Sequence, residues 1–127
     1  MALSDGVGSC KLSHFGSRAL CESVIELSFE CLCEIDDSKS FLEKLNARWL
    51  KKLRGLDINE CACTALFVIV KDKRFTIFHL GDGAAVVLAD GVPAVTIDFK
   101  EEGFCNYTYA MEEELYFNNL EDYNSDI

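Results

Sequence analysis

Two aspartates stand beside glycines at points where a run of apolar residues gives way to a turn. Asp5 lies in the segment SDGVGS over residues 4–9, and Asp82 lies in GDG over residues 81–83. Glycine permits positive φ angles and a close approach of backbones. The short side chain of aspartate either caps nearby N–H groups or ligates a hard cation. From the local sequence alone, each aspartate is therefore either a turn former or a metal ligand.

The cysteines offer a second kind of chemistry, because thiolates bind zinc. The two close pairs, Cys31-x-Cys33 and Cys61-x-Cys63, have one intervening residue, whereas zinc knuckles have two or more. The number of cysteines is odd and they sit in apolar, periodic segments, so we expect buried small hydrophobes in a reducing compartment. A zinc-binding module stays open as a third hypothesis. The seven residues are Cys10, Cys21, Cys31, Cys33, Cys61, Cys63 and Cys105.

The elements that must position these side chains change in type midway along the chain. Apolar residues recur with a helical period over residues 12–35 and again over residues 41–53. Beyond residue 59 short β-rich runs predict strands at residues 61–70, 75–80, 84–89, 92–99 and 104–111. Asp90-Gly91 between two of these runs predicts a tight hairpin turn. The order predicts an α+β fold, with two helices packed on an antiparallel β-meander.

Composition limits the partners that the chain can have. The 127 residues suit one domain, of which residues 112–127 form an acidic tail with no clean period. The formal net charge of -10 disfavours nucleic acid and anionic lipid. No apolar run reaches the roughly 18 residues that span a bilayer, and the amino terminus lacks a signal-peptide pattern. We therefore expect a cytoplasmic protein with no nucleic-acid or membrane partner.

The ordered motifs resemble those of the metal-dependent protein phosphatases of the type 2C (PPM) family. They are SDGVGS before a helix, CTAL over residues 63–66 opening a strand, FHLGDGA over residues 78–84 ending the next, and NYT over residues 106–108. Val7 after the Asp-Gly pair is similar to the bacterial-style branch. The resemblance covers roughly residues 2–111, and it implies a partial version of the family's α-β-β-α sandwich.

The resemblance also implies a site and an activity. By that resemblance, Asp5 offers its carboxylate and Gly6 its backbone carbonyl to a pair of Mg²⁺ or Mn²⁺ ions. In this family the two metals activate a bridging water that attacks phosphoserine or phosphothreonine in a phosphoprotein substrate. Asp82 matches a buried structural aspartate of the family, and no side chain here is assigned a directly catalytic role.

The sequence departs from the family pattern in its remaining carboxylates. Further metal-binding carboxylates of the family lie before the Asp-Gly motif and after the NYT strand, and its amino-terminal phosphate-binding arginine has no counterpart here. We therefore expect a phosphatase domain incomplete at both ends, with little or no activity by itself. The alternative is a non-catalytic module on the same scaffold that binds a partner or regulates a complete phosphatase. Open sheet edges also favour a homodimer.

Overall fold

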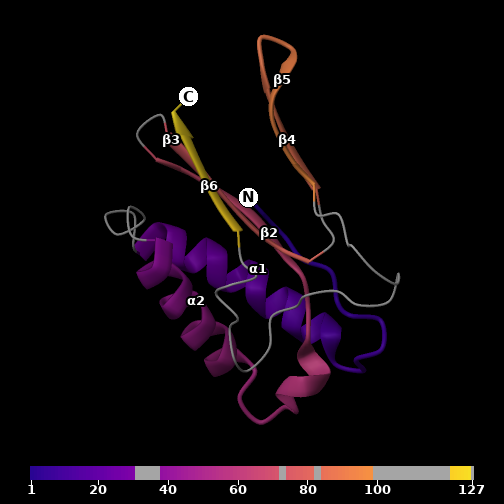
Figure 1. The fold of residues 1–127 in the computed structure, drawn as a ribbon. Coiled ribbons are helices and arrows are strands. Elements are labelled where there is room, and N and C mark those ends of the chain that lie inside the picture. The colour runs from indigo at the N-terminus through magenta and orange to yellow at the C-terminus, as the bar shows by residue number, and fades with distance from the viewer. Residues whose placement is uncertain (31–37, 72–73, 82–83, 99–120, 127) are drawn as a thin grey trace.

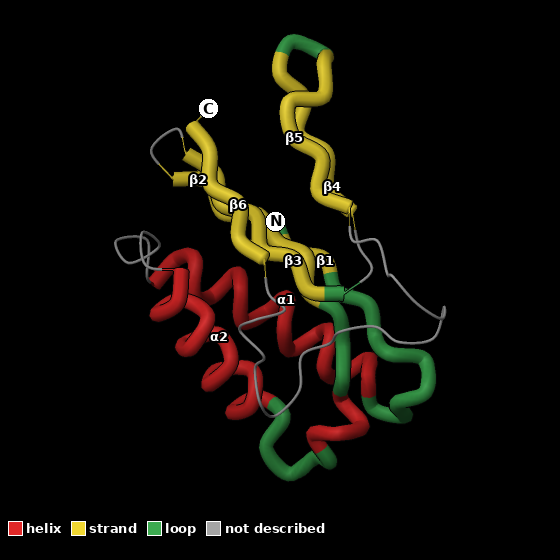
Figure 2. The backbone as a smooth tube through the Cα atoms, in the orientation of Figure 1, coloured by secondary structure: helices red, strands yellow, loops and turns green. Residues whose placement is uncertain are grey.

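The computed structural model describes residues 1–30, 38–71, 74–81, 84–98 and 121–126. Two antiparallel helices lie side by side against one face of a four-stranded antiparallel sheet, and a separate β-hairpin stands beside it (Figures 1 and 2). The predicted α+β class is confirmed. In chain order the elements are β1 (Ala2–Leu3), α1 (Ser13–Glu30), α2 (Ser38–Lys52), the 3₁₀ helix η1 (Ile58–Cys61), β2 (Ala65–Lys71), β3 (Arg74–Leu80), β4 (Ala84–Ala89), β5 (Val92–Asp98) and β6 (Glu121–Asp126).

The sheet differs from a simple meander in its last strand. Its strand order is β1-β2-β3-β6, while β4 and β5 form a two-stranded sheet of their own. The neighbour of β3 is therefore β6 and not β4, with Arg74 opposite Asp126 and His79 opposite Glu121. Residues 121–126 were expected only as part of an acidic tail with no clean period, and the structure shows a strand there. Their sequence, EDYNSD, carries little strand signal, so the ladder with β3 depends on a long-range pairing.

One predicted boundary needs correction, and two other predictions fall on residues that are not described. The strand predicted from residue 61 starts at Ala65, since Cys61 still belongs to η1 and Cys63 forms only an isolated bridge with Gly6. The Asp57 side chain caps that turn by accepting the Asn59 N–H at 3.2 Å. The first helix is described as far as Glu30, so its predicted end near residue 35 lies outside the described residues. The strand predicted at residues 104–111 also lies outside them.

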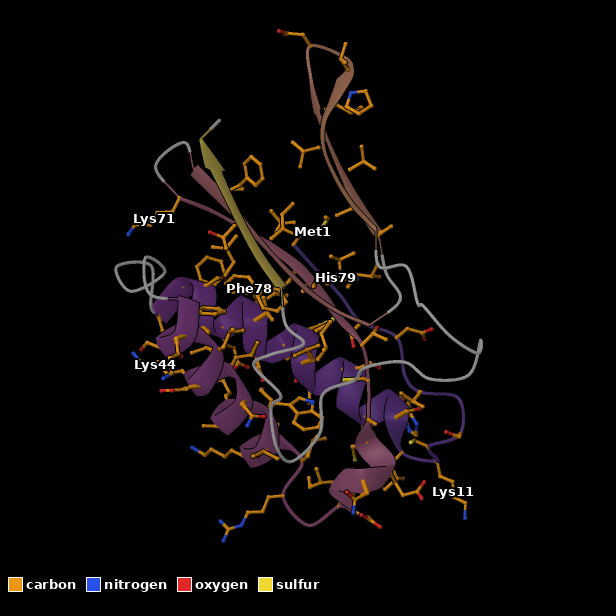
Figure 3. The ribbon with its side chains drawn as sticks, in the orientation of Figure 1. Met1, Lys11, Lys44, Lys71, Phe78 and His79 are labelled. Carbon is orange, nitrogen blue, oxygen red and sulfur yellow. The ribbon has the colours of Figure 1, made fainter. Side chains whose placement is uncertain are left out.

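The hydrophobic core lies between the helices and the inner face of the sheet. Phe67 on β2 and Phe78 on β3 are paired across the ladder, with ring centroids 4.6 Å apart. Phe41 from α2 stacks on Phe78 at 5.7 Å, and Figure 3 shows Phe78 where the sheet faces the helices. Trp49 of α2 is fully buried, and its indole N–H donates to the Gly16 carbonyl of α1 at 2.9 Å. None of the helices in the described ranges is long and apolar enough to span a bilayer.

A row of ion pairs joins the exposed sides of α1 and α2. Arg48 contacts Glu26 and Glu30, while Lys52 contacts Glu26 at 2.8 Å and Glu22 at 3.4 Å. The Arg48 guanidinium, hydrogen-bonded to Glu30, holds the pKa of that carboxyl below its ordinary value of 4.5. Because the folded pKa is lowered, the stabilisation is present above the ordinary pKa and is lost as pH falls through the lowered value.

The first testable prediction concerns this row. Arg48→Met keeps most of the aliphatic stem but removes the guanidinium, so we expect it to lower Tm by a few degrees at pH 7. At about pH 3, where free carboxyls are protonated, part of this stabilisation is lost, so we expect the difference in Tm between the two proteins to be smaller. Thermal unfolding followed by circular dichroism at both pH values measures the difference. An equal gap at both pH values would show that packing of the stem, and not the charge, is responsible.

Candidate metal-binding site at the end of β1

Asp5 and Gly6 follow the edge strand β1, which lies beside β2 in the sheet and ends at Leu3. The ladder pairs Ala2 with Phe67, and the isolated bridge between Gly6 and Cys63 keeps the same register. Asp5 is therefore opposite Thr64. The predicted placement of the Asp-Gly pair at a strand end is confirmed by this geometry.

The main chain of Asp5 is fixed, while its side chain is exposed. Its carbonyl accepts the Thr64 N–H at 2.8 Å, and its own N–H donates to Thr64 Oγ1 at 3.0 Å. Within the described residues, the Asp5 carboxylate makes no ion pair or hydrogen bond. A carboxylate of this kind, held on a rigid backbone and open to solvent, suits a hard cation.

The Gly6 carbonyl points away from β2. The Val7 N–H donates to Ala62 O at 3.0 Å and the Thr64 N–H donates to Asp5 O at 2.8 Å, so Gly6 and Cys63 form a non-hydrogen-bonded pair. In such a pair the N–H and C=O groups of both residues point outward from the ladder. The backbone oxygen of Gly6 therefore faces the open edge of β1, next along the chain from the Asp5 carboxylate.

Glycine is required at position 6 by a close approach of α1. A Cβ atom added there would lie 2.5 Å from Ser13 Oγ and 2.7 Å from Ser13 Cβ, at the first residue of α1. A positive φ angle, the other expected reason for glycine, does not apply, since the described glycines with positive φ are Gly55, Gly81 and Gly91. The helix is thus packed directly against the backbone of the candidate ligand.

The loop from Gly6 to α1 is held along η1. Glu60 accepts two backbone N–H groups of this loop, that of Lys11 at its carboxylate (2.7 Å) and that of Leu12 at its carbonyl (2.9 Å). The Cys10 thiol donates to Asn59 O at 3.5 Å, and Figure 3 shows Lys11 beside this turn. The carboxylate of Glu60 therefore organises the backbone near the site.

The other predicted site residue, Asp82, lies outside the described residues, as do residues 106–108. Gly81 before it is buried and has a φ of +109°, so the backbone makes the sharp break that the GDG motif predicts. The structural role of Asp82 stays a prediction.

Cys61 and Cys63 behave as core residues, as expected. Both are fully buried, and burial raises the pKa of the Cys63 thiol to about 12. Zinc binds thiolates, so a thiol that stays protonated at neutral pH is a poor ligand. Among the described residues, no three His, Cys, Asp or Glu side chains gather to hold a metal ion.

Sequence reasoning missed the roles of Thr64, which hydrogen-bonds the Asp5 backbone, and of Ser4, whose hydroxyl donates to the Thr64 carbonyl. Thr64 stands in the CTAL motif, but its contact with Asp5 depends on the register between β1 and β2, which the motif does not encode. Thr64 lies in a segment that the sequence predicts to be a buried strand. Nothing in that pattern indicates that its hydroxyl would hydrogen-bond the backbone of another strand.

A comparison with known protein families gives a match over most of the chain. A family model described as protein phosphatase 2C matches residues 1–121, which include Asp5, Gly6 and Asp82. A search of curated proteins and a search of solved structures each returned no match.

Proposed function

The chain belongs to the protein phosphatase 2C family, and on that premise we propose that it is a metal-dependent domain for hydrolysis of phosphoserine and phosphothreonine in phosphoproteins. One observation supports the metal dependence most directly. Asp5 presents an unpartnered carboxylate, within the described residues, and Gly6 presents an outward carbonyl from adjacent positions on one fixed backbone. Two hard oxygen donors of this kind suit Mg²⁺ or Mn²⁺.

The residues of the chain supply the geometry, and the metals supply the nucleophile. The chemistry that the two ions would supply when bound is a water molecule of lowered pKa, able to act as the nucleophile towards phosphorus. Asp5 and Gly6 would hold the ions, while Thr64 fixes the Asp5 backbone and Ser13 fills the space beside Gly6. We assign Asp82 a structural role and no metal.

We also propose that residues 1–127 alone bind metal weakly and act slowly. Each Mg²⁺ ion takes about six oxygen ligands, part of them from protein and the rest from water and phosphate. Asp5 and Gly6 provide one carboxylate and one carbonyl, which is a small share for two ions. We place the protein in the cytoplasm, where a reducing environment keeps thiols such as Cys61 and Cys63 free. Homodimer formation stays a prediction.

The second testable prediction measures the role of Asp5. Asp5→Asn keeps the shape of the side chain and removes its charge, so we expect Mn²⁺-dependent hydrolysis of a phosphothreonine peptide to fall by about 10-fold or more. The Tm should not change, since the carboxylate has no partner among the described residues. The matched control is Asp90→Asn, which removes an exposed carboxylate from the β4–β5 turn, at the end of the hairpin away from β1 (Figure 2).

The outcomes separate the two functional hypotheses. Loss of activity in Asp5→Asn but not in Asp90→Asn supports a phosphatase that uses Asp5. Equal activity in all three proteins would contradict the metal assignment. If the wild-type chain hydrolyses no peptide and shows no Mn²⁺ effect on the amide signals of Asp5 and Gly6, the non-catalytic module becomes the better hypothesis.

A further inference from the structure

The ladder that continues β1 and β2 lacks hydrogen bonds that its register predicts, and one of them would join Asp5 and Thr64. Met1 and Val68 exchange two bonds, Met1 N–H to Val68 O at 3.0 Å and Val68 N–H to Met1 O at 2.9 Å. In an antiparallel ladder such doubly bonded pairs recur at every second residue. Asp5 and Thr64 should therefore also exchange two bonds. Only the bond from Thr64 N–H to Asp5 O is made between their backbones, at 2.8 Å.

Two hydroxyl groups hydrogen-bond the backbone N–H and C=O groups that the missing bond would have joined. The Asp5 N–H donates to Thr64 Oγ1 at 3.0 Å, and the Thr64 carbonyl accepts from Ser4 Oγ at 2.6 Å. We call Ser4 and Thr64 together the hydroxyl clasp. Because both backbone groups still have partners, the strands can separate at Asp5 without leaving a polar group unsatisfied.

We propose that the hydroxyl clasp positions Asp5 for metal binding, a role that rests on the proposed function of Asp5 as a ligand. The direction of a short carboxylate depends on the backbone that carries it. In a regular strand the Asp5 N–H would donate to the Thr64 carbonyl. Here it donates to the Thr64 hydroxyl, which therefore fixes the direction of the Asp5 N–H. Threonine is β-branched and stiff about χ1, so its Oγ1 is held more firmly than a serine hydroxyl. Thr64 is thus a positioning residue that acts through Asp5.

The third testable prediction compares Thr64→Val with Thr64→Ser. Valine keeps the branched shape and removes the acceptor, while serine keeps the acceptor. In metal-free protein, amide hydrogen exchange at Asp5 should become fast in Thr64→Val and stay slow in Thr64→Ser. With Mn²⁺, paramagnetic broadening of the Asp5 and Gly6 amide signals should need about 10-fold more metal in Thr64→Val. Thr64→Ser should stay close to wild type.

Each outcome decides a different point. Unchanged Asp5 exchange in Thr64→Val would overturn the clasp itself. Fast exchange of the Asp5 amide in Thr64→Val with an unchanged Mn²⁺ titration would overturn the positioning role. The hydroxyl clasp would then be only the way in which the strand ends. If wild-type protein shows slow Asp5 exchange but no Mn²⁺ broadening there, the proposed metal site fails and the positioning role fails with it. Should Thr64→Val unfold, Thr64→Ala, which removes the same hydroxyl acceptor, replaces it in both measurements.

Discussion

Gly16→Ala is expected to lower the free energy of unfolding by about 3 kcal/mol, although a glycine-to-alanine change inside a helix ordinarily stabilises it by about 1 kcal/mol. A Cβ atom at position 16 would overlap the carbonyl oxygen of Cys61 and lie 2.8 Å from its carbonyl carbon. Both are backbone atoms of η1, so no change of rotamer relieves the contact. Urea denaturation followed by circular dichroism measures the loss.

The matched control for this prediction is Gly8→Ala in the loop before α1. No atom lies within 4 Å of a Cβ added at Gly8, and its φ is not positive, so its stability should stay within about 0.5 kcal/mol of wild type. A Gly16→Ala protein as stable as wild type would show that α1 can move away from η1 at little cost. Since Ser13, in the same turn of α1, packs on Gly6, we also expect Gly16→Ala to weaken any Mn²⁺ binding at Asp5.

The features that sequence alone predicted are those determined by residues close together in the sequence. The periods of the two helices and the Asp90-Gly91 turn are local patterns, and both turn residues have the positive φ angles, 51° and 77°, that a tight hairpin needs. Asp5 was placed at a strand end for the same reason. Such patterns depend on few residues and on no tertiary contact, so the folded structure keeps them.

The features that sequence missed depend on contacts between distant segments. The strand β6 is polar, and its place beside β3 is decided by pairing across more than 40 intervening residues. The hydroxyl clasp needs Thr64 opposite Asp5, and the requirement for glycine at positions 6 and 16 comes from neighbours on other elements. Periodicity and turn statistics carry none of this information, because they describe one segment at a time.

Trp49→Ala is the other prediction with a large expected effect. Trp49 has no exposed surface, and its indole N–H donates to Gly16 O at 2.9 Å, so the change removes both a large buried volume and a buried hydrogen bond. We expect a loss of about 3–5 kcal/mol, a large share of the stability of an ordinary domain. Circular dichroism during urea unfolding measures it. Trp49→Phe should lose less, because the phenyl ring fills most of the cavity.

The control and the double variant show what Trp49 does for the site. Phe29→Ala, at an aromatic residue 77% exposed on the same helix pair, should change stability by no more than about 0.5 kcal/mol. The Trp49 indole is hydrogen-bonded to Gly16, the residue of α1 that packs closely on η1. Trp49→Phe and Gly16→Ala therefore disturb the same contact between α1 and its neighbours. Their combined loss should therefore be smaller than the sum of the single losses. Additive losses would contradict this coupling and would mean that the indole bond and the close approach of η1 support α1 independently.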